Sequence, residues 1–190
     1  MSKSYKQITV ALARQIRLVV TDIDGTITMD FPVAEPAPEP AIPELFDALG
    51  IAPVDFLRSD GDFFLAVVDS PDVVRTLAPD FARLRALREA RGVYVSARGD
   101  DGYDIVSRCF APKVGIDEDA VTGSMHCVLL AYWAPRLGRD ELRAYQASAR
   151  GGEMTVARDG DRALLTGRAV TVLRGDLAAV PGELRRDPVA

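Results

Sequence analysis

The sequence predicts an α+β domain built from hairpin-connected strands, one central buried helix and one or two outer helices. Three patterns indicate this class. Short apolar or alternating segments follow one another across tight turns, as hairpin strands do. The segment 124–138, SMHCVLLAYWAPRLG, is apolar around nearly its whole circumference, which is typical of a helix enclosed by other elements. Strands and helices do not alternate regularly, as they would in a parallel α/β sheet.

The strands are expected where apolar residues alternate or cluster between turn residues. Asp24-Gly25 is a strong hairpin signal, because glycine adopts the positive φ of such turns without strain. After this turn, Ile27, Met29 and Phe31 alternate with polar residues, as in a half-buried strand. Further turns are expected at 59–62, 98–102 and 159–160. The strands are expected at residues 16–21, 26–31, 54–58, 63–69, 93–97, 103–110, 154–156, around 164 and 169–173.

The helices and connectors follow from proline placement and helical spacing. Five prolines between residues 32 and 43 exclude a helix interior or a central strand and predict an extended connector. A short helix is expected at 43–49, with proline near its start and glycine directly after it. Residues 71–91 carry helical spacing. Residues 111–123 are expected to form a loop before the buried helix, which Pro135 can bend or end.

Composition limits the classes of function. The 190 residues are 48% hydrophobic and 27% charged, an ordinary globular balance. A net charge of −5 argues against nucleic acid as a partner, and no apolar run approaches the roughly 20 residues of a membrane span. The two cysteines, Cys109 and Cys127, form no disulfide framework or metal cluster, so we expect buried free thiols and a cytoplasmic location. The basic start faintly resembles a transit peptide.

The stretch LVVTDIDGTIT, residues 18–28, spells the start of a haloacid-dehalogenase-like phosphatase, with Asp22 as nucleophile, Asp24 as general acid and magnesium between them. That interpretation also requires a parallel α/β sheet and a downstream cation to offset phosphoryl charge. Here an alternating strand follows at once. Lys113 lies almost directly before the acidic group 117–119, which leaves no room for a helix between them. The phosphatase is therefore the weaker alternative.

The segment GIDEDAVTGSMHC, residues 115–127, carries the clearest chemistry. It is an acidic loop that leads into the N-terminus of the buried helix, where free N–H groups and the helix dipole favour an anion. Gly123 lets a ligand approach the backbone, and Ser124 can donate to it or cap the helix. Asp119 lies close enough to exchange a proton with that ligand. The alternative, left open here, is that Thr122 or Ser124 only caps the helix and the acids are a solvated loop.

Several segments in a fixed order resemble the phenazine-biosynthesis PhzF-like family, relatives of diaminopimelate epimerase. The segment around residue 119 resembles the family signature EDPVTGSAHC. Others are TITMDFP, RGDDGYDIVSRCFAPKVGIDEDAVTGSMHC, LRAYQASARGGEMTV and LLTGRAVTVLRGDL. The resemblance covers residues 17–177. It implies a diaminopimelate epimerase-like lobe, a curved mixed or antiparallel sheet wrapped around the central helix. Residues 1–16 are expected to be an unmatched leader and residues 178–190 a frayed tail.

The resemblance also implies a cofactor-independent isomerase or epimerase. Such enzymes need no metal and no organic cofactor, and use one acid/base residue from each of two lobes to move a proton on a small carboxylate. His126 and the turn at 150–152 have structural explanations as well, a core residue and a plain turn. The implied site residues are Asp119 for catalysis, and Thr122, Gly123, Ser124, His126, Arg150, Gly151 and Gly152 for substrate binding.

Two departures from the family pattern affect this expectation. The family proline after the aspartate is Ala120 here, which loosens the backbone that aims the carboxylate. The first lobe, with its catalytic glutamate, has no counterpart before residue 17. The chain is therefore expected to supply only the C-terminal lobe, partnered by a missing first lobe or by a second copy of itself in a dimer. A catalytically incomplete, self-associating binding lobe remains an alternative, with no nucleic-acid or membrane partner.

Overall fold

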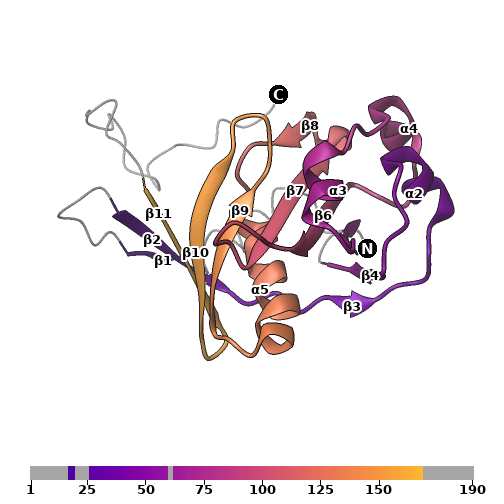
Figure 1. Cartoon of the computed structure of the whole chain (residues 1–190). Helices are drawn as coiled ribbons and strands as arrows, with labels where there is room; N and C mark the ends of the chain where they lie inside the picture. Colours follow the sequence, from indigo (N-terminus) through magenta and orange to yellow (C-terminus); the bar gives the residue numbers. More distant parts are fainter. Residues whose placement is uncertain (1–16, 20–25, 60–61, 169–190) are drawn as a thin grey trace, which may run out of the picture.

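One large mixed sheet organises the part of the chain that the computed structural model describes, residues 17–19, 26–59 and 62–168 (Figure 1). Ten strands follow the order β1-β2-β11-β10-β9-β7-β6-β5-β4-β3, and β8 pairs with β7 outside this path. The strands are β1 (Arg17–Val19), β2 (Thr26–Pro32), β3 (Ala37–Pro38), β4 (Asp55–Arg58), β5 (Phe63–Val67), β6 (Gly92–Arg98), β7 (Ile105–Ala111), β8 (Ile116–Asp119), β9 (Glu141–Gln146), β10 (Gly152–Asp159) and β11 (Arg162–Arg168). The helices are α2 (Pro43–Leu49), α3 (Pro71–Thr76), α4 (Phe81–Ala86), the 3₁₀ turn η2 (Pro112–Val114) and α5 (Gly123–Leu137).

Two strand pairs are parallel, and each is joined by helices. The β5–β6 pair is connected through α3 and α4, and the β7–β9 pair through α5. Parallel strands need such crossover connections, whereas the remaining antiparallel pairs are mostly linked by short turns. The sheet is therefore mixed but dominated by antiparallel pairing, as the sequence predicted.

Helix α5 lies at the centre of the larger core. Ten consecutive residues from Met125 to Ala134 are buried, because strands of the curved sheet surround the helix. Contacts come from both halves of the sheet, including Leu65 of β5, Leu142 of β9 and Leu165 of β11. A helix that is apolar all round is stable only when it is enclosed in this way. The predicted enclosed helix is confirmed, and its first residue is Gly123.

Helices α2, α3 and α4 cover the opposite face of β4–β7 and form a second core (Figure 1). Successive residues of a strand point to opposite faces, so Phe64 packs in this core and Leu65 packs against α5. The same division separates Val93 from Tyr94 in β6. Both faces of these strands are therefore buried, which holds β7 and its neighbours rigidly in place.

Most of the expected elements are confirmed. The hairpins β4–β5, β6–β7 and β10–β11 are antiparallel, and α2 ends at Gly50, whose φ of 69° is left-handed. The strand β1 pairs with β2, which is the antiparallel arrangement that the phosphatase alternative does not allow. The turn Asp24-Gly25, Asp22, the strand at 169–173, the leader and the tail lie outside the described residues. No helix in the described part of the chain is long and apolar enough to cross a membrane.

Two expectations are wrong in detail. The helical segment 71–91 is two short helices, because Pro79 restricts the residue before it and cannot donate within a helix; Asp80 then caps α4 through a bond from the N–H of Arg83. The loop expected at 111–123 contains η2 and the strand β8. The sequence of β8, IDED, has too few apolar residues to show the alternation of a strand.

Candidate active site

The candidate site forms where β8, β9 and the start of α5 meet. One edge of β7 is shared by two strands: Ser107 pairs with Gln146 at the end of β9, and Cys109 pairs with Asp119 at the end of β8. The strand β6 occupies the other edge of β7. The ends of β8 and β9 are therefore held side by side, and the chain passes from Asp119 directly into the first turn of α5.

Within the described part of the chain, no side chain makes a capping hydrogen bond to the N-terminus of α5. Thr122 is the N-cap residue, with φ −113° and ψ 106°, but its hydroxyl does not accept from the helix. Thr122 Oγ1 instead donates to Asp119 Oδ2 at 2.7 Å. Ser124 lies inside the first turn, where it is exposed. Thr122 is therefore the N-cap residue by position, but its side chain makes no capping bond within the described structure of this 15-residue helix.

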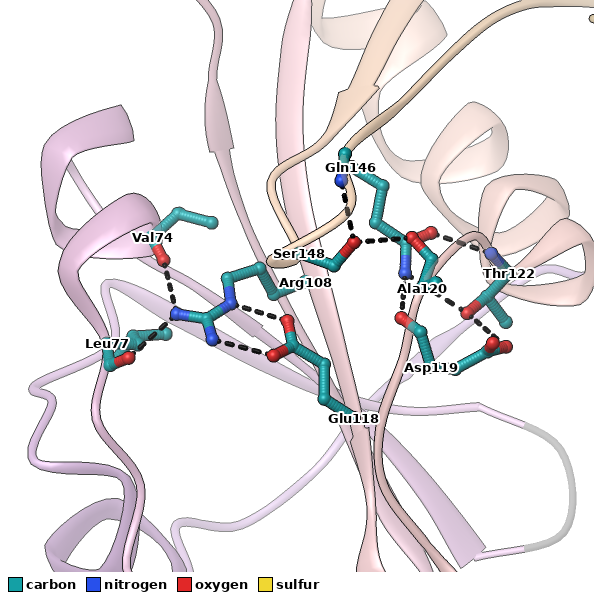
Figure 2. Close-up of polar contacts among 10 residues, drawn as sticks. Val74, Leu77, Arg108, Glu118, Asp119, Ala120, Thr122, Gln146 and Ser148 are labelled. Carbon is teal, nitrogen blue, oxygen red and sulfur yellow. Dashed lines mark hydrogen bonds and ion pairs between the residues drawn. The ribbon is translucent and has the colours of Figure 1, made fainter.

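The three neighbouring acids have different surroundings. Asp117 pairs with Arg85, and Glu118 forms a two-pronged ion pair with Arg108 at 2.7 and 2.8 Å (Figure 2). Asp119 forms no ion pair among the described residues, and its side chain bonds only to Thr122. The acidic loop is therefore only partly exposed to solvent: Asp117 is exposed, whereas Glu118 and Asp119 are half-buried. Arginines pair with two of its carboxylates, and the third has no cation partner among the described residues.

Arg108 ties the site to the outer helices. Its side chain is 11% exposed, and Nη1 donates to the carbonyl oxygens of Leu77 at 2.7 Å and Val74 at 3.4 Å, at the end of α3 (Figure 2). The guanidinium also lies 4.8 Å from the ring centre of Phe110. Because the Glu118 carboxylate that it holds directly precedes Asp119, Arg108 fixes the strand that presents the candidate acid/base group.

Gln146 connects the two strand ends to the helix. The residue is fully buried; Oε1 accepts from the Thr122 N–H at 2.7 Å, and Nε2 donates to the Asp119 carbonyl oxygen at 2.6 Å (Figure 2). Gln146 is not among the site residues that the sequence predicts. The sequence nevertheless carries a signal for it: Leu142, Ala144 and Gln146 occupy alternate, buried positions of one strand. A polar side chain in such an apolar series needs a buried hydrogen-bond partner.

The turn after β9 packs against the loop that carries Asp119. Ser148 Oγ donates to the Ala120 carbonyl at 2.8 Å, and the Gly151 N–H donates to the Ser148 carbonyl at 2.9 Å. Gly151 has a φ of 69°. A methyl group on Gly152 would lie 2.3 Å from Val121 Cγ2, so a larger residue here would have to displace Val121. The turn therefore lies beside the site, and its contact with a substrate stays a prediction.

The predicted binding residues reach the surface to different extents. Asp119, Thr122, Gly123, Gly151 and Gly152 are half-buried, whereas Ser124 and Arg150 are exposed. Arg150 forms no ion pair within the described ranges. A methyl group on Gly123 would make only ordinary contacts, the nearest at 3.5 Å from Leu165, so packing alone does not require glycine there.

His126 lies inside the protein, beneath the first turn of α5. Its ring is fully buried, and Nδ1 donates to the Thr122 carbonyl at 2.7 Å. Burial lowers the pKa of His126 to about 4, so the ring is neutral near pH 7. Nε2 has no partner among the described residues. The ring supports the helix start from within, which matches the interpretation of His126 as a core residue rather than a surface contact.

The two thiols are buried and unpaired, as the sequence predicted. Burial raises the pKa of both Cys109 and Cys127 to about 12. They are therefore protonated near neutral pH and poorly suited to act as nucleophiles or acid/base groups. This leaves Asp119 as the titratable group of the candidate site that is both half-buried and free of a cation partner in the described structure.

A separate hollow of about 460 Å³ lies on the face of β9, β10 and β11 that points away from α5. Arg143, Thr155 and Thr166 line it, and these residues alternate with those that pack against the helix. None of the predicted site residues lines this hollow. The chemistry that the sequence points to and this hollow are therefore on different faces of the sheet.

Comparison with known proteins places this geometry in a family. A family model described as phenazine biosynthesis-like protein matches residues 7–175, and so begins within the segment expected to be an unmatched leader. An uncharacterized isomerase of Pseudomonas aeruginosa is 46% identical over 164 residues, which cover 86% of this chain and 62% of that protein. An uncharacterized isomerase of Halalkalibacterium halodurans is 43% identical, over 80% of this chain and 57% of that protein.

Solved structures agree with this fold. The crystal structure of a PhzF-family phenazine biosynthesis protein from Enterococcus faecalis superposes with a TM-score of 0.74 at 38% identity, covering 80% of this chain and 57% of that one. A predicted epimerase from Pseudomonas aeruginosa, at 16% identity and a TM-score of 0.60, shares the fold. This chain spans about three fifths of the length of these relatives. The chain therefore belongs to the phenazine biosynthesis-like, or PhzF, family.

Proposed function

We propose that this chain carries one acid/base half of a cofactor-independent isomerase site, in which Asp119 moves a proton on a small carboxylate bound at the start of α5. One observation carries the proposal. Of three consecutive carboxylates, Asp119 alone lacks a cation partner within the described residues, and its carboxylate bonds to Thr122 at the uncapped end of a long buried helix. Relatives named as isomerases support the reaction class.

The carboxylate of the substrate would bind to the first N–H groups of α5. Uncapped N–H groups and the positive end of the helix dipole attract an anion, and the exposed hydroxyl of Ser124 adds a donor. Arg150 lies in the turn that packs against the same loop and would add positive charge. These groups would fix the carboxylate end of a small acid and leave its reacting carbon beside Asp119.

Asp119 would then act as the base. Its Oδ2 accepts the hydroxyl proton of Thr122, and Oδ1 has no partner within the described residues. Oδ1 would take a proton from the substrate carbon and return it. Moving the proton to the other face of that carbon requires a second group, which we place in the portion of the relatives that this chain does not match.

Hydrogen exchange in D₂O tests this proposal without knowledge of the full reaction. A single base can remove a C–H proton and return a deuteron to the same face, so the chain alone should exchange hydrogen without inverting the substrate. We expect loss of the C–H signal in proton NMR for one or more members of a panel of small 2-amino, 2-hydroxy and unsaturated carboxylic acids. Asp119→Asn should slow the exchange by roughly 10²–10⁴-fold while the acid still binds.

Two results would contradict the proposal. One is a rate of exchange that Asp119→Asn leaves unchanged, because another group would then be the base. The other is the absence of exchange with every acid in the panel together with no acid-induced shift of the amide signals of Gly123 and Ser124. Ser148→Ala, which removes a bond to the same loop but leaves Asp119 and Thr122 intact, is a control for nonspecific loosening.

A further inference from the structure

We infer that Gln146 is the positioning residue of this site: its side-chain amide sets the direction of the Thr122 hydroxyl and thereby holds Asp119 as a proton acceptor. The inference rests on the proposed function and adds to it a residue that is 27 positions away in the sequence and does not itself reach the surface. It follows from the three hydrogen bonds that the buried Gln146 amide makes (Figure 2).

The orientation of the Gln146 amide is fixed by its partners. The Thr122 N–H can only donate, so the atom 2.7 Å from it must be the oxygen, Oε1. The Asp119 carbonyl can only accept, so the atom 2.6 Å from it must be the nitrogen, Nε2. The second N–H of Nε2 points to Thr122 Oγ1 at 3.3 Å. Both donors and the acceptor of the amide are therefore used, and a flipped amide would lose all of these bonds.

This arrangement determines where the Thr122 proton goes. A hydroxyl has one proton, and when its oxygen accepts from Gln146 Nε2 that proton is directed to another acceptor. The acceptor is Asp119 Oδ2, at 2.7 Å. The bonds thus run in one direction, from the Gln146 amide through the Thr122 hydroxyl to the Asp119 carboxylate, and each strengthens the next. The Asp119 carboxylate is thereby held by one oxygen, Oδ2, and its other oxygen faces no partner among the described residues.

Gln146 is well placed to hold this geometry because it belongs to a rigid element. It is the last residue of β9, it pairs with Ser107 on β7, and the buried face that it shares with Leu142 and Ala144 packs against α5. Asp119 pairs with Cys109, which follows Ser107 by two residues on β7. The base and its positioning residue are therefore set at a fixed spacing along one central strand, and sites held by strands are more precise than sites held by loops.

The test compares Gln146→Met, an uncharged side chain of similar length, with wild type in the full chain. Hydrogen exchange of backbone amides is followed by NMR. We expect the Thr122 amide to exchange roughly tenfold faster in Gln146→Met, because it loses its acceptor, while the amides of Val128 to Leu130 within α5 change by less than about twofold. Thr28→Val removes a hydroxyl bond to Thr166 elsewhere in the sheet and should leave Thr122 unchanged.

A second measurement separates positioning from simple support. For an acid whose C–H hydrogen the wild type exchanges in D₂O, Gln146→Met should slow this exchange by roughly tenfold or more. The dissociation constant for acetate should change by less than about twofold, because Gln146 does not contact the helix N–H groups. If the effect passes through the Thr122 hydroxyl, the double variant with Thr122→Val should be no slower than Thr122→Val alone.

The inference is overturned if Gln146→Met keeps the slow Thr122 exchange, or if the effects of Gln146→Met and Thr122→Val on the reaction multiply. A general loss of protection throughout α5 also overturns it, because Gln146 would then be only a core residue. Failure of the proposed function has a different signature: the wild type exchanges hydrogen with no acid in the panel, and no acid shifts the amide signals of Gly123 and Ser124. In that case the amide exchange at Thr122 alone decides whether Gln146 sets the geometry of the loop.

Discussion

Replacing Gly152 with alanine should push the loop that carries Asp119 out of place. The added methyl would lie 2.3 Å from Cγ2 of Val121 and 3.3 Å from its Cγ1. An ordinary contact begins at about 3.4 Å, so Val121 or the strand start must move by about 1 Å. Val121 is β-branched and therefore has few side-chain conformations into which to retreat. Because Val121 lies between Asp119 and Thr122, the movement should disturb the bond between them.

The size of the effect can be worked from this overlap. Forcing one methyl into a packed position typically costs about 1–3 kcal/mol of unfolding free energy. For a chain of this length, about 2 kcal/mol corresponds to a melting temperature lower by about 4–8 °C. The Cβ of Val121 lies 3.4 Å from the added methyl, an acceptable contact. Val121→Ala should therefore relieve the overlap, and the double variant should recover most of the loss that Gly152→Ala causes.

Thermal unfolding followed by circular dichroism measures this prediction. Gly167→Ala in β11 is the matched control, because its added methyl would meet nothing closer than 3.9 Å. We expect Gly167→Ala to leave the melting temperature almost unchanged. The steric argument would be refuted if Gly152→Ala had the same melting temperature as wild type. It would also be refuted if the double variant with Val121→Ala were less stable than Gly152→Ala alone.

Two further predictions concern buried polar groups. The pKa of His126 falls from 6.5 to about 4 on folding, so the unfolded chain binds more protons between these values and stability is lost as pH falls through this window. Urea unfolding measures how far the free energy of unfolding falls between pH 7 and pH 4.5. This fall should be about 2 kcal/mol larger for wild type than for His126→Phe, and equal falls would contradict burial of the ring. Ser96→Ala should cost about 1–3 kcal/mol, because Trp133 Nε1 and the Val106 carbonyl lose their shared partner; urea unfolding within about 0.5 kcal/mol of wild type would contradict this.

The elements that the sequence predicted are those whose signal is local. The continuous apolar stretch of α5 shows that it is enclosed, and the glycine after α2 marks a left-handed stop. Turn residues between apolar segments locate the hairpins. The sequence alone also indicates where the candidate site lies, because an acidic residue directly before a helix start is a local pattern. Each of these follows from residues within a few positions of one another.

The features that sequence reasoning missed depend on distant partners. The strand β8 exists because β7 offers it an edge and because arginines from α4 and β7 neutralise Asp117 and Glu118. Gln146 acts through bonds that span 24 and 27 residues. Pairings over such distances are set by the fold, and a stretch such as IDED has no periodicity that announces them. The difference between Asp119 and its neighbours could therefore be recognised only in the structure.

The most direct test of the account is an NMR titration of the ¹⁵N-labelled chain with a small carboxylate such as acetate or benzoate. The account predicts saturable shifts of the amides at the start of α5, above all Gly123 and Ser124, in wild type and in Asp119→Asn alike, since the helix N–H groups bind and Asp119 reacts. Shifts confined to the hollow around Arg143, or no saturable shift at α5, would contradict it.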